Sequence, residues 1–237
     1  AVYWLVTAYG WPLPLAALGS VALVTVLGLL VHLLIIAPIL SSPPVNQLLA
    51  TGGLLFFLQS FATFLWAPDH RSLRLALPIL EVFGMFLSFA RLLAFAVSLL
   101  AMLGLYLFLT RTYMGTAIRA VSQDREAMAL MGADTRKVYL VTSGIGGAMA
   151  GLAGALLIIQ YSVHPHFGAA FGPLTFMICV LGGLGNMFGA VVASLLMSEV
   201  ISVGGIITST EMAYVVAFVI FIVAIFVRPE GILGKRE

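Results

Sequence analysis

The stretch Leu15–Ala37, LAALGSVALVTVLGLLVHLLIIA, contains no Lys, Arg, Asp or Glu. A helix needs about 20 apolar residues to cross the roughly 30 Å hydrocarbon core of a bilayer, and this run is long enough. Its residues lack the two-residue alternation that is typical of membrane barrel strands. The stretch is therefore predicted to be a membrane-spanning helix, and it indicates that the whole chain is a membrane protein.

The composition supports this prediction. Hydrophobic residues make up 62% and charged residues 8% of the 237-residue chain, and the mean hydropathy is +1.16. A soluble domain has about a quarter charged residues, so we expect an integral protein in contact with membrane lipid. The formal net charge of +2 is too small to indicate a nucleic-acid partner.

Other apolar runs predict further spans. Sequence between Phe171 and Val203 is interrupted by GGLGN, which would divide it into two short segments, and Ala1–Tyr9 looks like the tail of an earlier span. We therefore expect an all-α polytopic membrane protein with about seven membrane segments plus a partial N-terminal one, forming one transmembrane domain over residues 1–237. The remaining predicted spans are Leu48–Trp66, Leu92–Thr110, Tyr139–Gln160 and Ala213–Val227.

Charge gathers in one segment, Arg111–Val138, called the charged segment below. Burying its five cations at the bilayer centre would cost more than about 10 kcal/mol, so the segment is expected in water. Basic residues near span ends favour the cytoplasmic side. Counting the predicted spans from this cytoplasmic segment places Arg71 and Arg74 on the outer side, where the rule does not expect basic residues. The five cations are Arg111, Arg119, Arg125, Arg136 and Lys137.

A short helix, Gln123–Met131, is predicted within the charged segment. Ser122 is expected to cap it, Asp124 and Glu126 place negative charge in its first turn, and Gly132 suits the left-handed position that ends a helix. The pattern allows two interpretations: an amphipathic helix resting on the membrane surface, or an apolar face that docks into a cytoplasmic partner.

The sequence REAMALMG, Arg125–Gly132, resembles the Glu-Ala-Ala-x-x-x-Gly loop of ABC importer permeases, with Met128 in place of the second Ala. Together with AMAGLAGALL, VLGGLGNMFGA and RPEGILG, it makes the chain from about Ala37 onward similar to the permeases of branched-chain amino-acid ABC importers. The ending PEGILG resembles the shorter of the two permease types. Urea and short-amide importers share this permease family.

The resemblance implies that the helix in the charged segment couples the permease to an ATPase. It implies a bacterial inner-membrane protein whose partners are a second permease, two cytoplasmic ATP-binding subunits, a periplasmic solute-binding protein and a small-molecule substrate. No G-x-x-x-x-G-K-[ST] motif occurs, so no cofactor is expected in this chain and ATP would be bound and hydrolysed by a partner. The implied coupling residues are Arg119, Asp124, Glu126, Ala127, Met128 and Gly132.

Members of this family carry further hydrophobic sequence at the N-terminus, including an Asn-Phe-Ala-His-Gly segment. Nothing before Ala1 corresponds to it. A chain shortened at its N-terminus relative to the family is therefore expected.

Two glycine-rich motifs lie in the apolar sequence. In SGIGGAMAGLAGALL, small residues four apart, with Gly147, Gly151 and Gly154 among them, would let another helix approach closely. They could serve plain packing or a moving interface between permease halves. The second motif, with Gly182, Gly183, Gly185 and Asn186, could be a tight turn or a broken helix in the substrate pathway.

Glu199 is the acidic residue that lies well inside an apolar run. An intramembrane carboxylate suggests a role in transport or gating, although Ser198 and Ser202 could satisfy it structurally. His164 and His166 have metal-like spacing, but two ligands alone do not predict a metal site. Protease and hydrolase motifs are missing, so the alternative to an ATP-driven permease is a gradient-driven transporter or channel.

Overall fold

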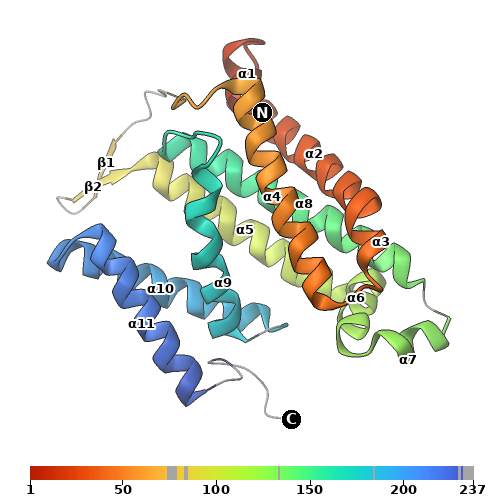
Figure 1. Cartoon of the computed structure of the whole chain (residues 1–237). Coiled ribbons are helices and arrows are strands. Elements are labelled where there is room, and N and C mark those ends of the chain that lie inside the picture. The colour runs from red at the N-terminus through yellow and green to blue at the C-terminus, as the bar shows by residue number, and fades with distance from the viewer. Residues whose placement is uncertain (74–78, 83–84, 133, 184, 229–230, 232–237) are drawn as a thin grey trace. The chain divides into compact units, whose positions relative to one another are not determined.

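The computed structural model describes residues 1–237 apart from 74–78, 83–84, 133, 184, 229–230 and 232–237. The described chain is helical except for one short hairpin, which confirms the predicted all-α membrane architecture (Figure 1). Among the described residues, six helices are long and apolar enough to cross a bilayer, and Phe167–Gly182 forms a shorter apolar one. Two compact units are present, Ala1–Pro165 and His166–Glu237.

The first unit contains most of the long helices. Its hairpin pairs β1 with β2 in antiparallel fashion, with Ile79 opposite Ser88. Three consecutive pieces, α2, η1 and α3, form one membrane-length element, Leu13–Ile39. The elements are α1 (Val2–Thr7), α2 (Leu13–Val31), the π-helix η1 (His32–Ile36), α3 (Ala37–Ile39), α4 (Pro44–Trp66), β1 (Ile79–Val82), β2 (Met85–Ser88), α5 (Phe89–Arg111), α6 (Tyr113–Gln123), α7 (Arg125–Leu130) and α8 (Thr135–Gln160).

Helices α2 and α8 run antiparallel and in close contact, and glycine makes this possible (Figure 1). A Cβ atom on Gly147 would lie 2.8 Å from the carbonyl oxygen of Val24, and one on Gly28 would lie 3.2 Å from Cα of Gly147. A Cβ on Gly151 would also meet α2, at 3.0 Å from Cα of Val21. Since lipid supplies no hydrophobic drive for association, such close backbone packing is a main source of helix affinity in membranes. A Cβ on Gly154, by contrast, would meet nothing within 4 Å.

Arg71 lies at the other end of α8 from the charged segment. Its backbone N–H and C=O form an isolated bridge with Val163, at 2.9 and 2.8 Å. Its guanidinium donates to the carbonyl oxygen of Trp66 at 2.7 Å and lies 4.8 Å from the ring of Trp4. This position agrees with the count of predicted spans, which places Arg71 on the side opposite the charged segment. The contacts give Arg71 a structural role on that side.

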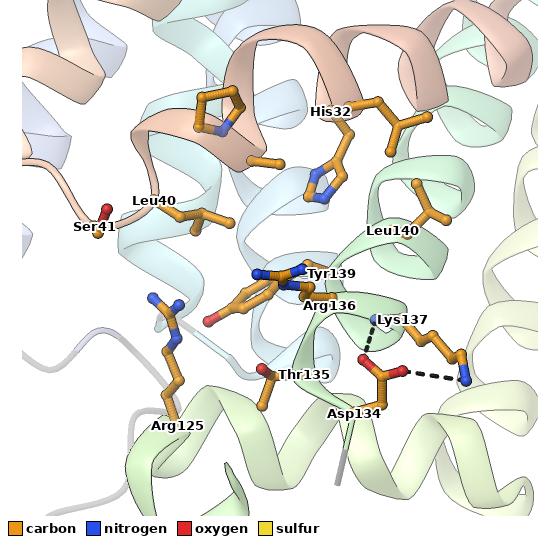
Figure 2. A pocket seen from close by; sticks show the side chains of 13 residues that line it. His32, Leu40, Ser41, Arg125, Asp134, Thr135, Arg136, Lys137, Tyr139 and Leu140 are labelled. Atoms are coloured by element: carbon orange, nitrogen blue, oxygen red, sulfur yellow. Dashed lines mark hydrogen bonds and ion pairs between the residues drawn. The ribbon is translucent and has the colours of Figure 1, made fainter.

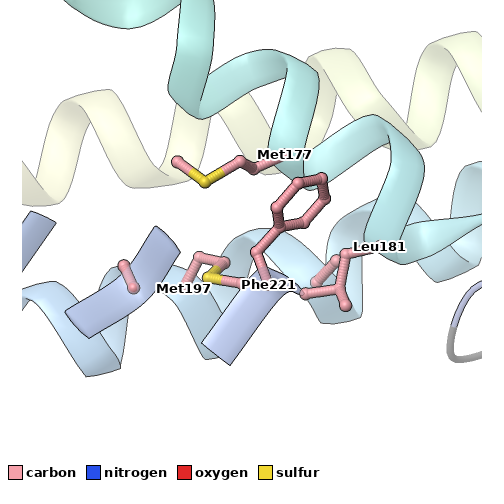
Figure 3. Packing of buried hydrophobic residues seen from close by; sticks show 6 residues of the cluster. Met177, Leu181, Met197 and Phe221 are labelled. Carbon is pink, nitrogen blue, oxygen red and sulfur yellow. The ribbon is translucent and has the colours of Figure 1, made fainter. Parts of the chain in front are cut away.

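The second unit comprises η2 (Phe167–Ala170), α9 (Phe171–Gly182), α10 (Met187–Ile207) and α11 (Thr210–Val227). Figure 3 shows side chains of α9, α10 and α11 meeting in one apolar cluster. The prediction of two short segments between Phe171 and Val203 is half wrong, because α10 has full membrane length. Asn186 caps its first turn, and no proline follows before Ile207, so the helix continues to full length. The buried cluster consists of Met177, Leu181, Ala193, Met197, Ala217 and Phe221.

Candidate functional site

The charged segment begins with a sharp turn between α5 and α6. Thr112 caps α6, since its hydroxyl accepts a hydrogen bond from the N–H of Gly115 at 3.0 Å and donates one to the carbonyl of Phe108 at 2.7 Å. A Cβ at Gly115 would collide with the backbone of Phe108 and Leu109. A side chain here would push the two helices apart, so glycine permits the tight change of direction.

Helix α6 is an element that the sequence reasoning missed. Its apolar side packs on the start of α8, where Ala117 and Val121 are buried against Val138. Arg119 is not part of this cluster and is exposed. Polar and apolar residues recur along α6 with helical spacing, and this pattern was the available signal. The charged segment is consequently built on the membrane helix α8 and is not a free loop.

The predicted helix Gln123–Met131 is shorter than expected and has a different cap. Helix α7 covers Arg125–Leu130. Asp124 caps it, with Oδ1 accepting from the N–H of Ala127 at 2.9 Å. Ser122 lies inside α6, and its hydroxyl donates to the carbonyl of Arg119 instead. The physical reason is that Asp124 has the extended backbone that a cap requires, whereas Ser122 remains helical.

Helix α7 ends in an exposed apolar tip. Leu130 and Met131 are 89% and 83% exposed, and Gly132 follows in the left-handed conformation with φ of +80°. Met128 packs against the α6 cluster, which attaches α7 to the rest of the segment. Ala127 is half-buried. Glu126 lies in α7, and its side chain is outside the described residues.

A cavity of about 620 Å³ opens between the charged segment and the end of the first membrane element (Figure 2). Arg125, Arg136 and Lys137 line it, and the Arg125 guanidinium lies 5.4 Å from the ring of Tyr139. Asp134 caps α8, and the N–H of Lys137, 3.2 Å from its Oδ1, lowers the pKa of this carboxyl. Lys137 also pairs with Asp134 through Nζ at 3.2 Å. We call this space the basic cavity.

His32 is a polar residue that sequence reasoning passed over. It is 4% exposed and lines the basic cavity, and its Nδ1 is hydrogen-bonded to the hydroxyl of Ser143 at 2.9 Å across the α2–α8 interface. It opens the π-helix η1, in which the N–H of Ala37 reaches back to the carbonyl of His32. This wide turn directly precedes Pro38, which has no N–H to donate. A lone ionisable residue inside an apolar run was the signal that could have found it.

The glycine motif in the second unit forms a turn between α9 and α10. Gly183 and Gly185 have φ of +92° and +83°, values that glycine tolerates best. Asn186 caps α10 by accepting from the N–H of Gly189 at 3.0 Å. A Cβ on Gly182 would lie 2.5 Å from the backbone nitrogen of Ala190, so the two helices meet backbone to backbone.

Glu199 lies on α10 and is exposed within the second unit. In the described part of the chain no hydrogen-bond or ion-pair partner accompanies it, and Ser198 and Ser202 are exposed as well. At the outer end of the first unit, the rings of His70 and His164 stack at 4.7 Å. Among the described residues no group of three potential metal ligands occurs.

Comparison with known proteins places the chain. The sequence pattern of a family described as "Branched-chain amino acid transport system / permease component" matches residues 1–225. The high-affinity branched-chain amino acid transport system permease protein LivH of Salmonella typhimurium is 31% identical over 245 residues, covering 99% of this chain and 76% of LivH. LivH of Escherichia coli strain K12 matches with the same identity and coverage.

Two further relatives match over less of their length. BraD of Pseudomonas aeruginosa, another high-affinity branched-chain amino acid transport system permease protein, is 33% identical over 80% of this chain and 64% of its own. A probable LivH of Methanocaldococcus jannaschii is 29% identical over 58% of this chain and 46% of its own. No solved structure matches the chain. The chain therefore belongs to the family of permease components of branched-chain amino acid transport systems.

Proposed function

We propose that this chain is the membrane-spanning permease subunit of an ATP-driven importer for branched-chain amino acids. The LivH and BraD relatives are permease proteins of branched-chain amino acid transport systems, which supports the substrate class. The observation that carries the ATP-driven mechanism is the tip of α7, where Leu130 and Met131 are exposed at the end of a segment otherwise rich in charge. Apolar helix faces of this kind dock into grooves of partner proteins.

The partners follow from this proposal. Two cytoplasmic ATP-binding subunits would hold ATP, one against α7, and a second, related permease would complete the translocation path. A periplasmic binding protein would deliver the amino acid. Helix α7 is attached to α6 and α8 through Met128, so a displacement of its tip would be passed to a membrane helix.

Arg119, Asp124, Glu126, Ala127, Met128 and Gly132 are proposed as coupling residues on this basis. Asp124 and Gly132 would fix the two ends of α7, and exposed Arg119 would face the ATPase.

A role in the solute pathway is proposed for Glu199 and for the turn of Gly182, Gly183, Gly185 and Asn186. A carboxylate on an apolar membrane helix is costly against lipid, so Glu199 would face the other permease or water. The turn would hold α9 and α10 at a fixed angle beside this path.

Co-purification and uptake test the proposal. The chain is expressed with its ATP-binding subunits, and a Leu130→Glu, Met131→Glu variant is compared with Tyr113→Glu, which changes an 88% exposed aromatic residue of α6. We expect the ATPase to be lost from the α7 variant and retained by the Tyr113 variant. ATP-dependent leucine uptake into vesicles should likewise be lost in the α7 variant and retained in the Tyr113 variant.

Three results would contradict it. Equal recovery of the ATPase with both variants would mean that the tip of α7 does not bind it. Leucine uptake driven by an ion gradient without ATP would indicate a secondary transporter or channel. Uptake of urea in place of leucine would move the chain to the urea and short-amide importers.

A further inference from the structure

The basic cavity has more positive than negative charge. Arg125, Arg136 and Lys137 line it against a single acidic residue, Asp134, which is already engaged as a cap and as the partner of Lys137. Among the described residues, Arg136 has no ion-pair or hydrogen-bond partner, and Arg125 contacts the ring of Tyr139. The cavity therefore offers at least two cations that a bound anion could neutralise.

The opposite wall of the basic cavity is apolar. Leu33, Ala37, Pro38 and Leu40 come from the end of the Leu13–Ile39 span, and Leu140 comes from the start of the α8 span. Leu33 and Leu34 beside it are 55% and 73% exposed, so this wall continues into the exposed apolar surface of the span. Figure 2 shows the cations on the side of the charged segment and His32 reaching in from the membrane side.

We propose that the basic cavity binds the headgroup of an anionic phospholipid of the cytoplasmic leaflet. The phosphate would lie between Arg125 and Arg136, with Lys137 held by Asp134 at the edge of the cavity, and the glycerol and upper acyl chains would follow the leucine wall into the bilayer. Basic pockets between membrane helices on the cytoplasmic side suit such headgroups. An acidic side chain of a protein partner would satisfy the cations but not the apolar wall. The proposal does not depend on ATP-driven transport.

The site has a structural consequence for transport. The cavity is bounded by α7, by the start of α8 and by the π-helix turn at His32, so a bound headgroup would tie the charged segment to the first membrane element. Anionic lipid would thereby hold α7 at a set distance from the membrane.

The test is native mass spectrometry of the full chain titrated with dioleoylphosphatidylglycerol, dioleoylphosphatidylcholine or inorganic phosphate. An Arg125→Gln, Arg136→Gln variant is compared with Arg111→Gln, Arg119→Gln, which removes the same charge from cations outside the cavity. We expect phosphatidylglycerol to bind more tightly than phosphatidylcholine, and each cavity cation removed to weaken it about fivefold. The Arg111, Arg119 variant should bind as the unaltered chain does.

Arg136→Lys separates charge from folding, since it keeps the cation and should retain most of the binding. Equal loss in the two double variants would overturn the proposal, because attraction would then be a property of the whole basic surface. So would equal retention of phosphatidylglycerol and phosphatidylcholine by the unaltered chain. Displacement of the lipid by millimolar inorganic phosphate would also overturn it, in favour of a free-anion site.

Discussion

Replacing Gly147 by Ala should destabilise the α2–α8 pair although it adds only one methyl group. The added Cβ would lie 2.8 Å from the carbonyl oxygen of Val24 and 3.1 Å from Cα of Thr25, whereas ordinary contacts begin at 3.4 Å. Both neighbours are backbone atoms and cannot rotate away. The two helices must therefore separate by about half an ångström, which forfeits part of the contact energy along their length.

The magnitude follows from two opposing terms. Overpacking costs about 1–3 kcal/mol, and replacing Gly by Ala inside a helix returns up to about 1 kcal/mol. Both obstructing atoms belong to the backbone, so the upper half of the overpacking range applies, about 2–3 kcal/mol. The resulting net loss of about 1–2 kcal/mol should lower the midpoint of thermal unfolding by about 2–8 °C for a chain of this size. The assay is thermal unfolding of the detergent-solubilised full chain, followed by loss of the monodisperse peak on size exclusion.

Gly154→Ala is the matched control, because the same methyl group on the same helix meets nothing within 4 Å. Its midpoint should stay unchanged or rise. Gly28→Ala tests the other helix, because its Cβ would lie 3.1 Å from the carbonyl oxygen of Ser143 on α8. Its unfolding midpoint should fall, as that of Gly147→Ala does. If Gly147→Ala and Gly154→Ala unfold at the same temperature, close backbone packing does not stabilise this pair.

Two smaller changes test local polar contacts. Ser143→Ala should lower the stability of the full chain by about 0.5–2 kcal/mol, since Nδ1 of buried His32 loses its partner, and thermal unfolding measures this; an unaltered midpoint would mean that the bond contributes nothing. Asp124→Ala removes the cap of α7 and should cost about 0.5–2 kcal/mol of local stability. Faster hydrogen exchange at the amide of Ala127 reports it, and Ser122→Ala should leave that exchange rate as it was.

The candidate site divides into what local pattern predicts and what it does not. The exposed end of α7 could be predicted, since Gly132 marks its termination and the Glu-Ala pattern marks its position. The cap could not be distinguished by residue type alone, because Ser122 and Asp124 are both good caps. The choice depends on where α6 ends, and α6 is stabilised by its packing on Val138.

The basic cavity was beyond the reach of sequence reasoning for a different reason. Arg125 and Lys137 are twelve residues apart in one segment, but Leu33 and Leu40 lie about a hundred residues away. Their meeting requires α2 and α8 to pack antiparallel in one register. That register is set by Gly28, Gly147 and the His32–Ser143 hydrogen bond. Only the hydrogen bond involves polar residues that stand out in an apolar sequence.

The amino-acid sequence was sufficient to identify an α-helical membrane protein, because long apolar runs leave only helices that satisfy their own backbone in lipid and a charged segment must stay in water. The likeness to importer permeases came from the motifs REAMALMG, VLGGLGNMFGA and RPEGILG. Tertiary structure alone decided which glycines bring helices together, since Gly147 and Gly154 have similar local sequence but different neighbours. It also decided that three cations and an apolar wall enclose one cavity. Such contacts depend on the relative position of distant helices, which local sequence does not encode.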